Sequence, residues 1–210
     1  MKKIASIILA AGFSSRMGQF KPVLPVGDKT LVAHVIDMYR TAGIADIRVV
    51  VGHHAECLYP VLHSLGVATV ENQKYEDGMF SSVQAGIRSL GEAHQGFFVH
   101  PVDVPLVQPQ TIHHLLTRFH EDSDRILYPA CQGRRGHPPF ISAVFADSIL
   151  NWNGRNGLKG ALSELEEKAR DVIVEDEGIL FDMDTEVDYR FIAERLSKPQ
   201  CAGGRLHLPQ

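Results

Sequence analysis

A short segment near the start of the chain carries the residues best suited to bind a ligand. From Leu9 to Lys21 it reads L-A-A-G-F-S-S-R-M-G-Q-F-K, and it follows an apolar run that predicts a buried strand. The small side chains of Ala10, Ala11 and Gly12 would let a ligand approach the backbone closely. We therefore expect this segment to be a binding loop.

Polar side chains in the same loop indicate a phosphate ligand. Backbone N–H groups and the hydroxyls of Ser14 and Ser15 can cradle phosphate oxygens. Arg16 offers planar, forked donors, and Lys21 offers a mobile point charge. Two cations beside a glycine suit a triphosphate better than a neutral metabolite, and the spacing fits neither a dinucleotide fingerprint nor a P-loop. The alternative, an ordinary strand-to-helix loop, would leave Arg16 and Lys21 without a task.

A carboxylate stands where another apolar strand is predicted to end. Residues 97–106 read F-F-V-H-P-V-D-V-P-L, and Asp103 follows the apolar part. Ligands of parallel sheets bind beyond the carboxyl ends of the strands, so Asp103 would point into the ligand crevice. A hard oxygen ligand of this kind, shared with triphosphate oxygens, is how Mg²⁺ is usually held. The alternative is that Asp103 only hydrogen-bonds a turn before Pro105.

Two more aspartates, Asp182 and Asp184, directly precede Thr185. On a strand, alternate residues point the same way, so these two could bring a second acidic ligand to the same ion. Equally, Thr185 could cap the next helix while the aspartates favour the positive end of that helix. The local chemistry leaves both interpretations open.

A glycine before a serine pair marks a further candidate. The stretch from Asn72 to Ser82 reads N-Q-K-Y-E-D-G-M-F-S-S, with Gly78 before the start of a predicted helix. Its backbone and hydroxyl groups could read a base edge or a sugar, and plain capping of the helix is the alternative.

The elements that would position these residues alternate between strand and helix in the first 120 residues. Four such alternations predict a parallel sheet covered by helices, with right-handed crossovers. Three of the candidate segments, residues 11–21, 72–82 and 103–106, then lie beyond the carboxyl ends of strands. We predict strands at residues 4–10, 47–51, 67–70 and 96–102, and helices at 30–42, 55–64, 81–90 and 110–119.

The second part of the chain is less regular. Thr185 and Asp188 form a capping box for a final helix that runs to about Leu196. Residues 1–197 are predicted to form a single domain, followed by a loose tail at 198–210. Between residues 125 and 160 we predict a strand at 125–130, a polar turn at 131–139 and a loop at 151–160, while residues 140–150 carry both strand and helix signals. After this loop we predict a helix at 162–169 and short strands at 172–174 and 180–181.

Composition excludes several classes of protein. The formal net charge of −4 offers no basic excess for a nucleic-acid partner. No apolar run approaches the roughly 20 residues that span a bilayer, so we expect no membrane association, and we interpret the apolar start as a strand rather than a secretory signal. Three scattered cysteines favour a reducing cytoplasm, and the histidine pairs fit no metal-ligand spacing.

Taken together, these segments resemble the molybdopterin nucleotidyltransferase family, and within it the molybdenum cofactor cytidylyltransferases. The first motif, L-A-A-G-x-S-x-R-M-G-x-x-K, is the most specific part of the resemblance. The others follow in the family's order and the match covers about residues 4–195: Asn72, then Gly78-Met79-x-Ser81-Ser82, Asp103-x-Pro105, Gly136-His137-Pro138 and Asp182-x-Asp184-Thr185.

The resemblance implies an α/β fold: a Rossmann-like, glycosyltransferase-A-like three-layer sandwich with a mostly parallel central sheet. It implies a Mg²⁺-dependent enzyme in which Asp103 is the main metal ligand and Asp182 the second, with Asp184 as substitute. His137 would lie on the acceptor side. Arg16, Lys21 and Asp103 would be catalytic, and the nucleotide would bind to Leu9, Ala10, Ala11, Gly12, Ser14, Ser15, Arg16, Lys21, Asn72, Gly78 and Ser82.

The resemblance also implies substrates. Guanylyltransferases of the family usually carry L-A-G-G where this chain has L-A-A-G, so Ala11 indicates CTP. The implied acceptor is the terminal phosphate of molybdenum-bearing molybdopterin, and apoenzymes of the xanthine dehydrogenase type would use the product.

One stretch departs from the family pattern. Cytidylyltransferases commonly show G-D-x-G-A-R after the Gly-His-Pro motif, whereas this chain has Arg155 in place of the acid. The reversal of charge lies where acceptor recognition is expected. Two alternatives therefore stay open: a related transferase that uses a sugar or alcohol phosphate, and a non-catalytic protein that binds nucleotide or cofactor.

Overall fold

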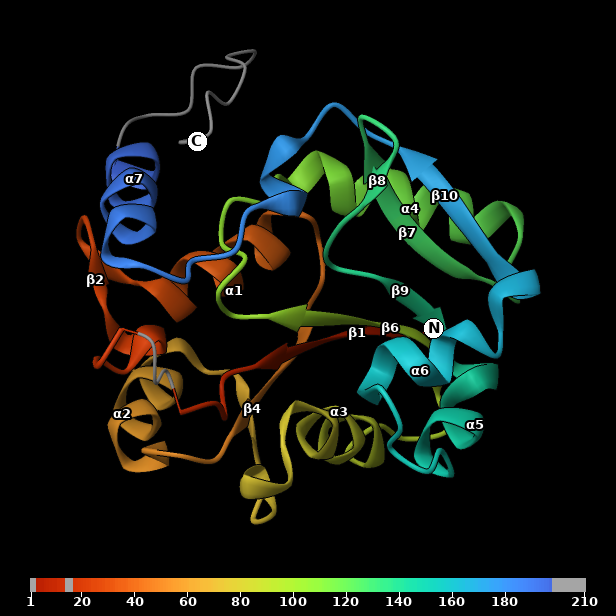
Figure 1. Ribbon diagram of the computed structural model, residues 1–210, viewed down its shortest axis with the longest axis horizontal. Helices are drawn as coiled ribbons and strands as arrows, with labels where there is room; N and C mark the ends of the chain where they lie inside the picture. Colours follow the sequence, from red (N-terminus) through yellow and green to blue (C-terminus); the bar gives the residue numbers. More distant parts are fainter. Residues whose placement is uncertain (1–2, 14–16, 198–210) are drawn as a thin grey trace.

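The computed structural model describes residues 3–13 and 17–197, and its centre is a β-sheet between two layers of helices (Figure 1). The strand order is β10-β7-β9-β6-β1-β4-β5, and the short β8 pairs with β7. The strands of this sheet are β1 (Lys3–Leu9), β4 (Asp46–Val51), β5 (Ala68–Glu71), β6 (His94–Pro101), β7 (Ile126–Cys131), β8 (Arg134–Arg135), β9 (Phe140–Ser142) and β10 (Ala169–Ile173).

Most strand pairs of the sheet are parallel, as the sequence predicted. β1 pairs in parallel with β4 and with β6, β4 pairs in parallel with β5, and β10 does so with β7. β9 runs antiparallel to both neighbours, β6 and β7. The predicted three-layer fold with a mostly parallel sheet is thereby confirmed.

Two apolar clusters cover the two faces of the sheet. Ile7 and Ile8 are neighbours on β1 yet belong to different clusters, because successive side chains of a strand point to opposite faces. This explains why the strand is apolar throughout. One face packs on α1 (Leu31–Thr41), α2 (Ala55–Leu65) and α4 (Pro109–Glu121), and the other on α3 (Met79–Arg88), α5 (Ala146–Leu150) and α6 (Gly157–Ser163).

The order of the strands creates a crevice at the centre of the sheet. From β1 the chain moves outward to β4 and β5, and then returns to the other side of β1 with β6. The loops that leave β1 and β6 therefore diverge at neighbouring strand ends, which is where open α/β sheets bind ligands.

The structure corrects the predictions for the second half. A helix was predicted at 162–169, but α6 begins earlier, because Asn156 and Gly157 both adopt the left-handed conformation that asparagine and glycine tolerate. β10 therefore begins at Ala169 rather than at residue 172. The predicted strand at 180–181 is also wrong: a 3-10 helix, η5 (Glu177–Leu180), stands there, and the Asp176 carboxylate accepts the Gly178 N–H at its start.

Further elements complete the picture. A hairpin of β2 (Pro25–Val26) and β3 (Lys29–Thr30) was not predicted, and Gly27 at its turn has a positive φ of 63°. The final helix, α7 (Glu186–Ser197), packs on β2 and begins with the predicted capping box, in which the Asp188 carboxylate accepts the Thr185 N–H at 2.7 Å. The predicted tail lies outside the described residues. Among the described helices, none has the length and apolar character needed to cross a membrane.

Candidate functional site

The predicted binding loop lines a cavity at the end of β1. Leu9, Ala10, Ala11 and Gly12 contribute to a cavity of about 290 Å³. Its backbone is held by the neighbouring strand β4, since the Ala10 N–H donates to the Val50 carbonyl at 2.9 Å. The loop thus continues the sheet before it turns away. Ser14, Ser15 and Arg16 lie outside the described residues.

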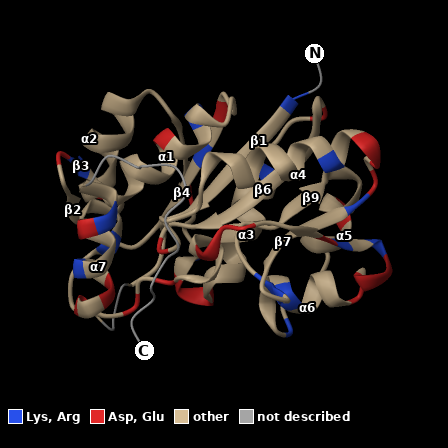
Figure 2. Cartoon of the chain, turned by 90° about the horizontal axis from the view of Figure 1, so that it is seen from above, with Lys and Arg blue, Asp and Glu red and all other residues tan. Residues whose placement is uncertain are grey.

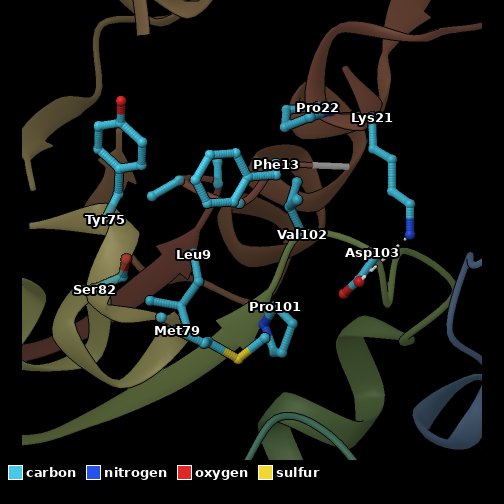
Figure 3. Close-up of a pocket in the computed structure, with 14 residues that line it drawn as sticks. Leu9, Phe13, Lys21, Pro22, Tyr75, Met79, Ser82, Pro101, Val102 and Asp103 are labelled. Carbon is cyan, nitrogen blue, oxygen red and sulfur yellow. Dashed lines mark ion pairs between the residues drawn. The ribbon is translucent and has the colours of Figure 1, made fainter. Parts of the chain in front are cut away.

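Lys21, at the end of the same loop, and residues from two other segments complete this cavity. Lys21, Gly78, Ser82 and Asp103 all line it, so the structure brings together four residues that the sequence had selected at separate positions. Residues that were not predicted as site residues contribute to its apolar wall; Figure 3 shows Tyr75, Phe13 and Val102 in the upper part of the view and Met79 and Pro101 below them.

Lys21 differs from the mobile charge expected from the sequence. Only 7% of the residue is exposed, and its ammonium group donates to the Met183 carbonyl. The same nitrogen lies 3.2 Å from an Asp184 oxygen and 3.9 Å from an Asp103 oxygen, the latter shown by the dashed line in Figure 3. Lys21 therefore fixes two acidic segments in space rather than extending into solvent.

The backbone around Asp103 is closely held. The Val104 N–H donates to the Pro101 carbonyl at 3.2 Å, which closes a turn around Asp103. The Met183 N–H donates to the Asp103 carbonyl at 2.8 Å, so the turn is joined to the segment that carries the other two aspartates. Burial raises the pKa of the Asp103 carboxyl, Lys21 partly offsets this, and the charge of Asp182 raises the pKa further.

Asp182 and Asp184 do not lie on a strand, contrary to one of the two predicted arrangements. Their segment has no regular secondary structure, although its residues alternate: Phe181 and Met183 are buried against α7, and the aspartates face away. Desolvation raises the pKa of Asp182, and the neighbouring His137 opposes that rise. The negative charges of Asp182 and Asp184 therefore disfavour ionisation of Asp103, and a cation would offset this effect.

The described residues allow a test of whether a metal fits here. They contain no set of three or more His, Cys, Asp or Glu side chains that could hold a metal ion by itself. Mg²⁺, however, is commonly bound by one or two carboxylates together with substrate phosphates and water. Asp103 and Asp182, a pair of carboxylates with raised pKa beside the predicted binding loop, fit that arrangement.

Asn72 shapes the cavity without lining it. Its buried amide donates to the Ser81 and Ser82 hydroxyls, at 2.8 and 2.9 Å, and its carbonyl oxygen accepts the Lys74 N–H at 3.0 Å. These bonds hold the loop that contains Gly78, whose φ of 92° favours glycine. Asn72 is therefore a loop-ordering residue, and Gly78 and Ser82 are the members of this segment that line the cavity.

A second and larger cavity of about 720 Å³ adjoins the first. The two cavities share Leu9, Met79 and Pro101 as lining residues. His137 lines the second cavity with its buried Nδ1 lacking a hydrogen-bond partner among the described residues, and burial lowers its pKa. Gly136 before it admits no side chain, because a Cβ there would lie 2.4 Å from the Ile179 carbonyl oxygen.

The positive charge of Arg135 in the wall of the second cavity is offset by two carboxylates. Arg135 binds Glu166 through two hydrogen bonds, at 2.7 and 3.0 Å, binds Asp171 at 2.6 Å, and lies over the Tyr128 ring. Lys159 also lines this cavity; it is the one basic residue of α6, the helix that is partly blue in Figure 2. Arg135 was not predicted to be a wall residue, because its carboxylate partners Glu166 and Asp171 lie more than 30 positions away in the sequence.

Known proteins resemble this chain along most of its length. The molybdenum cofactor cytidylyltransferase of Escherichia coli (strain K12) is 27% identical over 199 residues, which cover 94% of this chain and all of that protein. The bifunctional protein GlmU of Brevibacillus brevis is 35% identical over 125 residues, which cover 58% of this chain; the match spans about a quarter of the GlmU length.

Solved structures agree with the fold. The crystal structure of Rv0371c from Mycobacterium tuberculosis H37Rv superposes with a TM-score of 0.78 at 25% identity, covering 92% of this chain and 98% of that one. A structure of the same protein in complex with manganese gives a TM-score of 0.74 at 23% identity, with the same coverage.

The sequence model of the MobA-like NTP transferase domain matches residues 6–169, a span that includes the first loop, the Asn72 segment, Asp103 and the Gly-His-Pro motif. The chain therefore belongs to the MobA-like NTP transferase family and is a nucleotidyltransferase.

Proposed function

We propose that this chain transfers CMP from CTP to the terminal phosphate of molybdenum-bearing molybdopterin, producing molybdopterin cytosine dinucleotide and pyrophosphate. One observation carries the proposal: the cavity built from the first loop and Asp103 shares a wall with a second, larger cavity. A nucleotide in the first and an acceptor in the second would meet at the ends of β1 and β6.

The reaction needs no activated side-chain nucleophile, and we assign no general base. An oxygen of the acceptor phosphate attacks the α-phosphorus of CTP, a new P–O bond forms, and the bond to the pyrophosphate oxygen breaks. Both reactants are anions, so the chain must reduce their mutual repulsion and align them. We assign this role to Arg16 and Lys21 as cations and to the backbone of residues 9–12.

Asp103 and Asp182 would hold a divalent ion, for which we propose Mg²⁺. Asp184 is engaged by Lys21 at 3.2 Å, which favours Asp182 as the second ligand and keeps Asp184 as substitute. When bound, the ion would neutralise phosphate charge as a Lewis acid. The Mycobacterium tuberculosis structure in complex with manganese supports divalent-ion binding by a protein of this fold.

Ala11 would select the base of the nucleotide. Its Cβ lies against the position of Gly52, where a Cβ would come within 3.0 Å of it and within 2.6 Å of the Tyr75 side chain. Ala11 therefore occupies a confined part of the cavity wall, and we propose that its methyl group limits the space for a base. Together with the E. coli cytidylyltransferase relative, this supports CTP.

His137 and its neighbours would bind the acceptor. His137 Nδ1, which has no hydrogen-bond partner in the part of the chain that the structure describes, could bind a polar group of the acceptor, and Lys159 adds a positive charge. A second candidate acceptor is a sugar or alcohol phosphate, which is favoured by Arg155 in place of the family's acid and by the engagement of Arg135 with Glu166 and Asp171. We propose a cytoplasmic enzyme that supplies apoenzymes of the xanthine dehydrogenase type.

The test is an acceptor screen with the purified chain, Mg²⁺ and each of the four nucleoside triphosphates. We expect pyrophosphate release with CTP and molybdenum-bearing molybdopterin, and a product with the mass of the cytosine dinucleotide. Release with a sugar phosphate instead would establish the second candidate. Tight CTP binding without pyrophosphate release from any acceptor would indicate a non-catalytic binding protein.

A further inference from the structure

A buried histidine lies directly behind the turn that carries Asp103. His100, near the end of β6, and Tyr39, on α1, are both fully buried. The Tyr39 hydroxyl lies 3.0 Å from His100 Nδ1, and His100 Nε2 lies 2.9 Å from the Val104 carbonyl oxygen. The imidazole thus connects a helix of one layer to the residue that follows Asp103.

The partners determine where the protons are. A carbonyl oxygen can only accept, so His100 Nε2 must carry a hydrogen and donate it to Val104. In the neutral ring Nδ1 is then an acceptor, and the Tyr39 hydroxyl donates to it. Burial lowers the pKa of His100 to about 3, so the ring stays neutral throughout the physiological range. The Val104 carbonyl thereby sets the tautomer, and the Tyr39 hydroxyl stabilises it and orients the ring by donating to Nδ1.

The backbone of the turn has few other connections. Val102 N–H donates to the Leu9 carbonyl at 3.1 Å, and Met183 N–H to the Asp103 carbonyl at 2.8 Å. Val104 itself is fully buried, so its carbonyl would lose its partner without access to water if His100 were removed. The turn would then reorganise to satisfy that oxygen, and the Asp103 carboxylate would move with it.

We infer that His100, oriented by Tyr39, is a positioning residue that holds the Asp103 carboxylate where it can bind a divalent ion together with the triphosphate. The inference rests on the proposed function. It concerns residues outside both cavities, and it assigns a role to a buried polar pair that would otherwise be a costly feature of an apolar core.

The test compares CTP affinity with Mn²⁺ and without it, by titration calorimetry. The readout is the dissociation constant of CTP without Mn²⁺ divided by the dissociation constant with Mn²⁺. A general loss of stability does not change this ratio as long as the protein is folded. His100→Phe should reduce this ratio by about tenfold to a hundredfold, the usual effect of removing a group that orients a metal ligand. Tyr39→Phe should reduce it in the same direction but less, and His100→Gln, which keeps one donor and one acceptor, should restore much of it.

His94→Phe is a matched control. His94 is a second buried histidine of β6, at the end of the strand remote from the site, where Nε2 lies 2.9 Å from Asp46. Both Phe variants remove a hydrogen-bonded imidazole from the same strand, so both should lower the melting temperature. The His94 variant should keep the wild-type affinity ratio.

The possible results distinguish a failure of the proposed metal site from a failure of the role of His100. If the wild-type chain gains no CTP affinity from Mn²⁺, the metal assignment in the proposed function fails and the inference falls with it. If the wild type shows the gain and folded His100→Phe retains it in full, the inference alone is overturned. Should His100→Phe not fold, an unchanged ratio in Tyr39→Phe overturns it equally.

Discussion

Single residues of the site owe their roles to neighbours that are distant in the sequence. Lys21 was expected to be a mobile charge for phosphates, yet it is buried and bound to the Met183 carbonyl and to Asp184. Its ammonium group stabilises three converging carboxylates before any ligand arrives. Asp103 is the opposite case, because its exposure to the first cavity matches the expectation from the sequence.

The role of Asp103 can be tested by a change of one charge. Asp103→Asn preserves size and hydrogen bonding but removes the negative charge that would hold the ion. Pyrophosphate release should fall by about 10²–10³, the usual effect of losing one electrostatic contributor to a transition state. Asp124→Asn, a change of an exposed aspartate before β7, serves as the control. Normal turnover of the Asp103 variant would contradict the metal assignment.

The choice of base can be tested at Ala11. Ala11→Gly removes a methyl group from the wall near Tyr75 and Gly52, and a purine needs more room than a pyrimidine. We expect the variant to narrow the preference for CTP over GTP, measured as the ratio of kcat/KM for the two nucleotides. An unchanged ratio would show that Ala11 does not select the base.

At the scale of elements, β6 is held at both ends by a buried histidine. His100 connects its carboxyl end to α1, and His94 connects its amino end to Asp46 on β4. Asp46 also binds Arg48 at 2.9 and 3.1 Å. The sequence showed β6 as an apolar strand, but the two polar links that fix its position cannot be predicted from an alternation pattern.

The link at Asp46 predicts a pH dependence of stability. Hydrogen bonds from Arg48, and then from His94, lower the pKa of Asp46 below its ordinary value of 3.8. A lowered pKa stabilises the folded state above the unfolded-state pKa, and this stabilisation is lost as the pH falls through the folded-state pKa. The free energy of unfolding of Asp46→Asn should therefore be about 1–3 kcal/mol below wild type at neutral pH.

Urea unfolding measured from neutral to acidic pH checks this expectation. The difference between wild type and Asp46→Asn should shrink as the pH drops below 3.8. Asp124→Asn should differ from wild type by less than about 0.5 kcal/mol at every pH, as expected for an exposed position. A difference for Asp46→Asn that does not change with pH would contradict a charge-based role.

At the scale of the whole molecule, the site exists because the chain reverses direction across the sheet. β1 lies between β4 and β6, so the loops after β1 and β6 diverge and leave a crevice. The segment of Asp182 and Asp184 reaches the same crevice from the far end of the chain through its hydrogen bond to Asp103. Two cavities with a common wall result, one for each proposed substrate.

This arrangement predicts how ligands change the stability of the whole chain. Mg²⁺ alone should shift the melting temperature little, since no described set of three acidic or histidine side chains holds an ion by itself. Mg²⁺ with CTP at 100 times its dissociation constant should add about 2.7 kcal/mol of stability. Thermal unfolding of the wild type and of Asp103→Asn provides the measurement. An equal shift with Mg²⁺ alone would indicate a preformed metal site.

The sequence by itself determined the fold class, the order of the four strands and four helices predicted in the first 120 residues, and the loops that carry the first cavity; it missed the β2–β3 hairpin. It could do so because strand and helix periods are local, and because the carboxyl ends of parallel strands share one edge. Its errors fell where local signals are weakest, at α6 and η5, where glycine, asparagine and aspartate allow either a loop or a short helix.

Only the tertiary structure decided which side chains meet. Tyr39 and His100 are 61 positions apart, and Lys21 and Met183 are 162 positions apart. The same structure joined Arg135 to Glu166 and gave the site a second cavity. Such contacts depend on strand order and on the packing of the layers, which no local pattern of residues encodes.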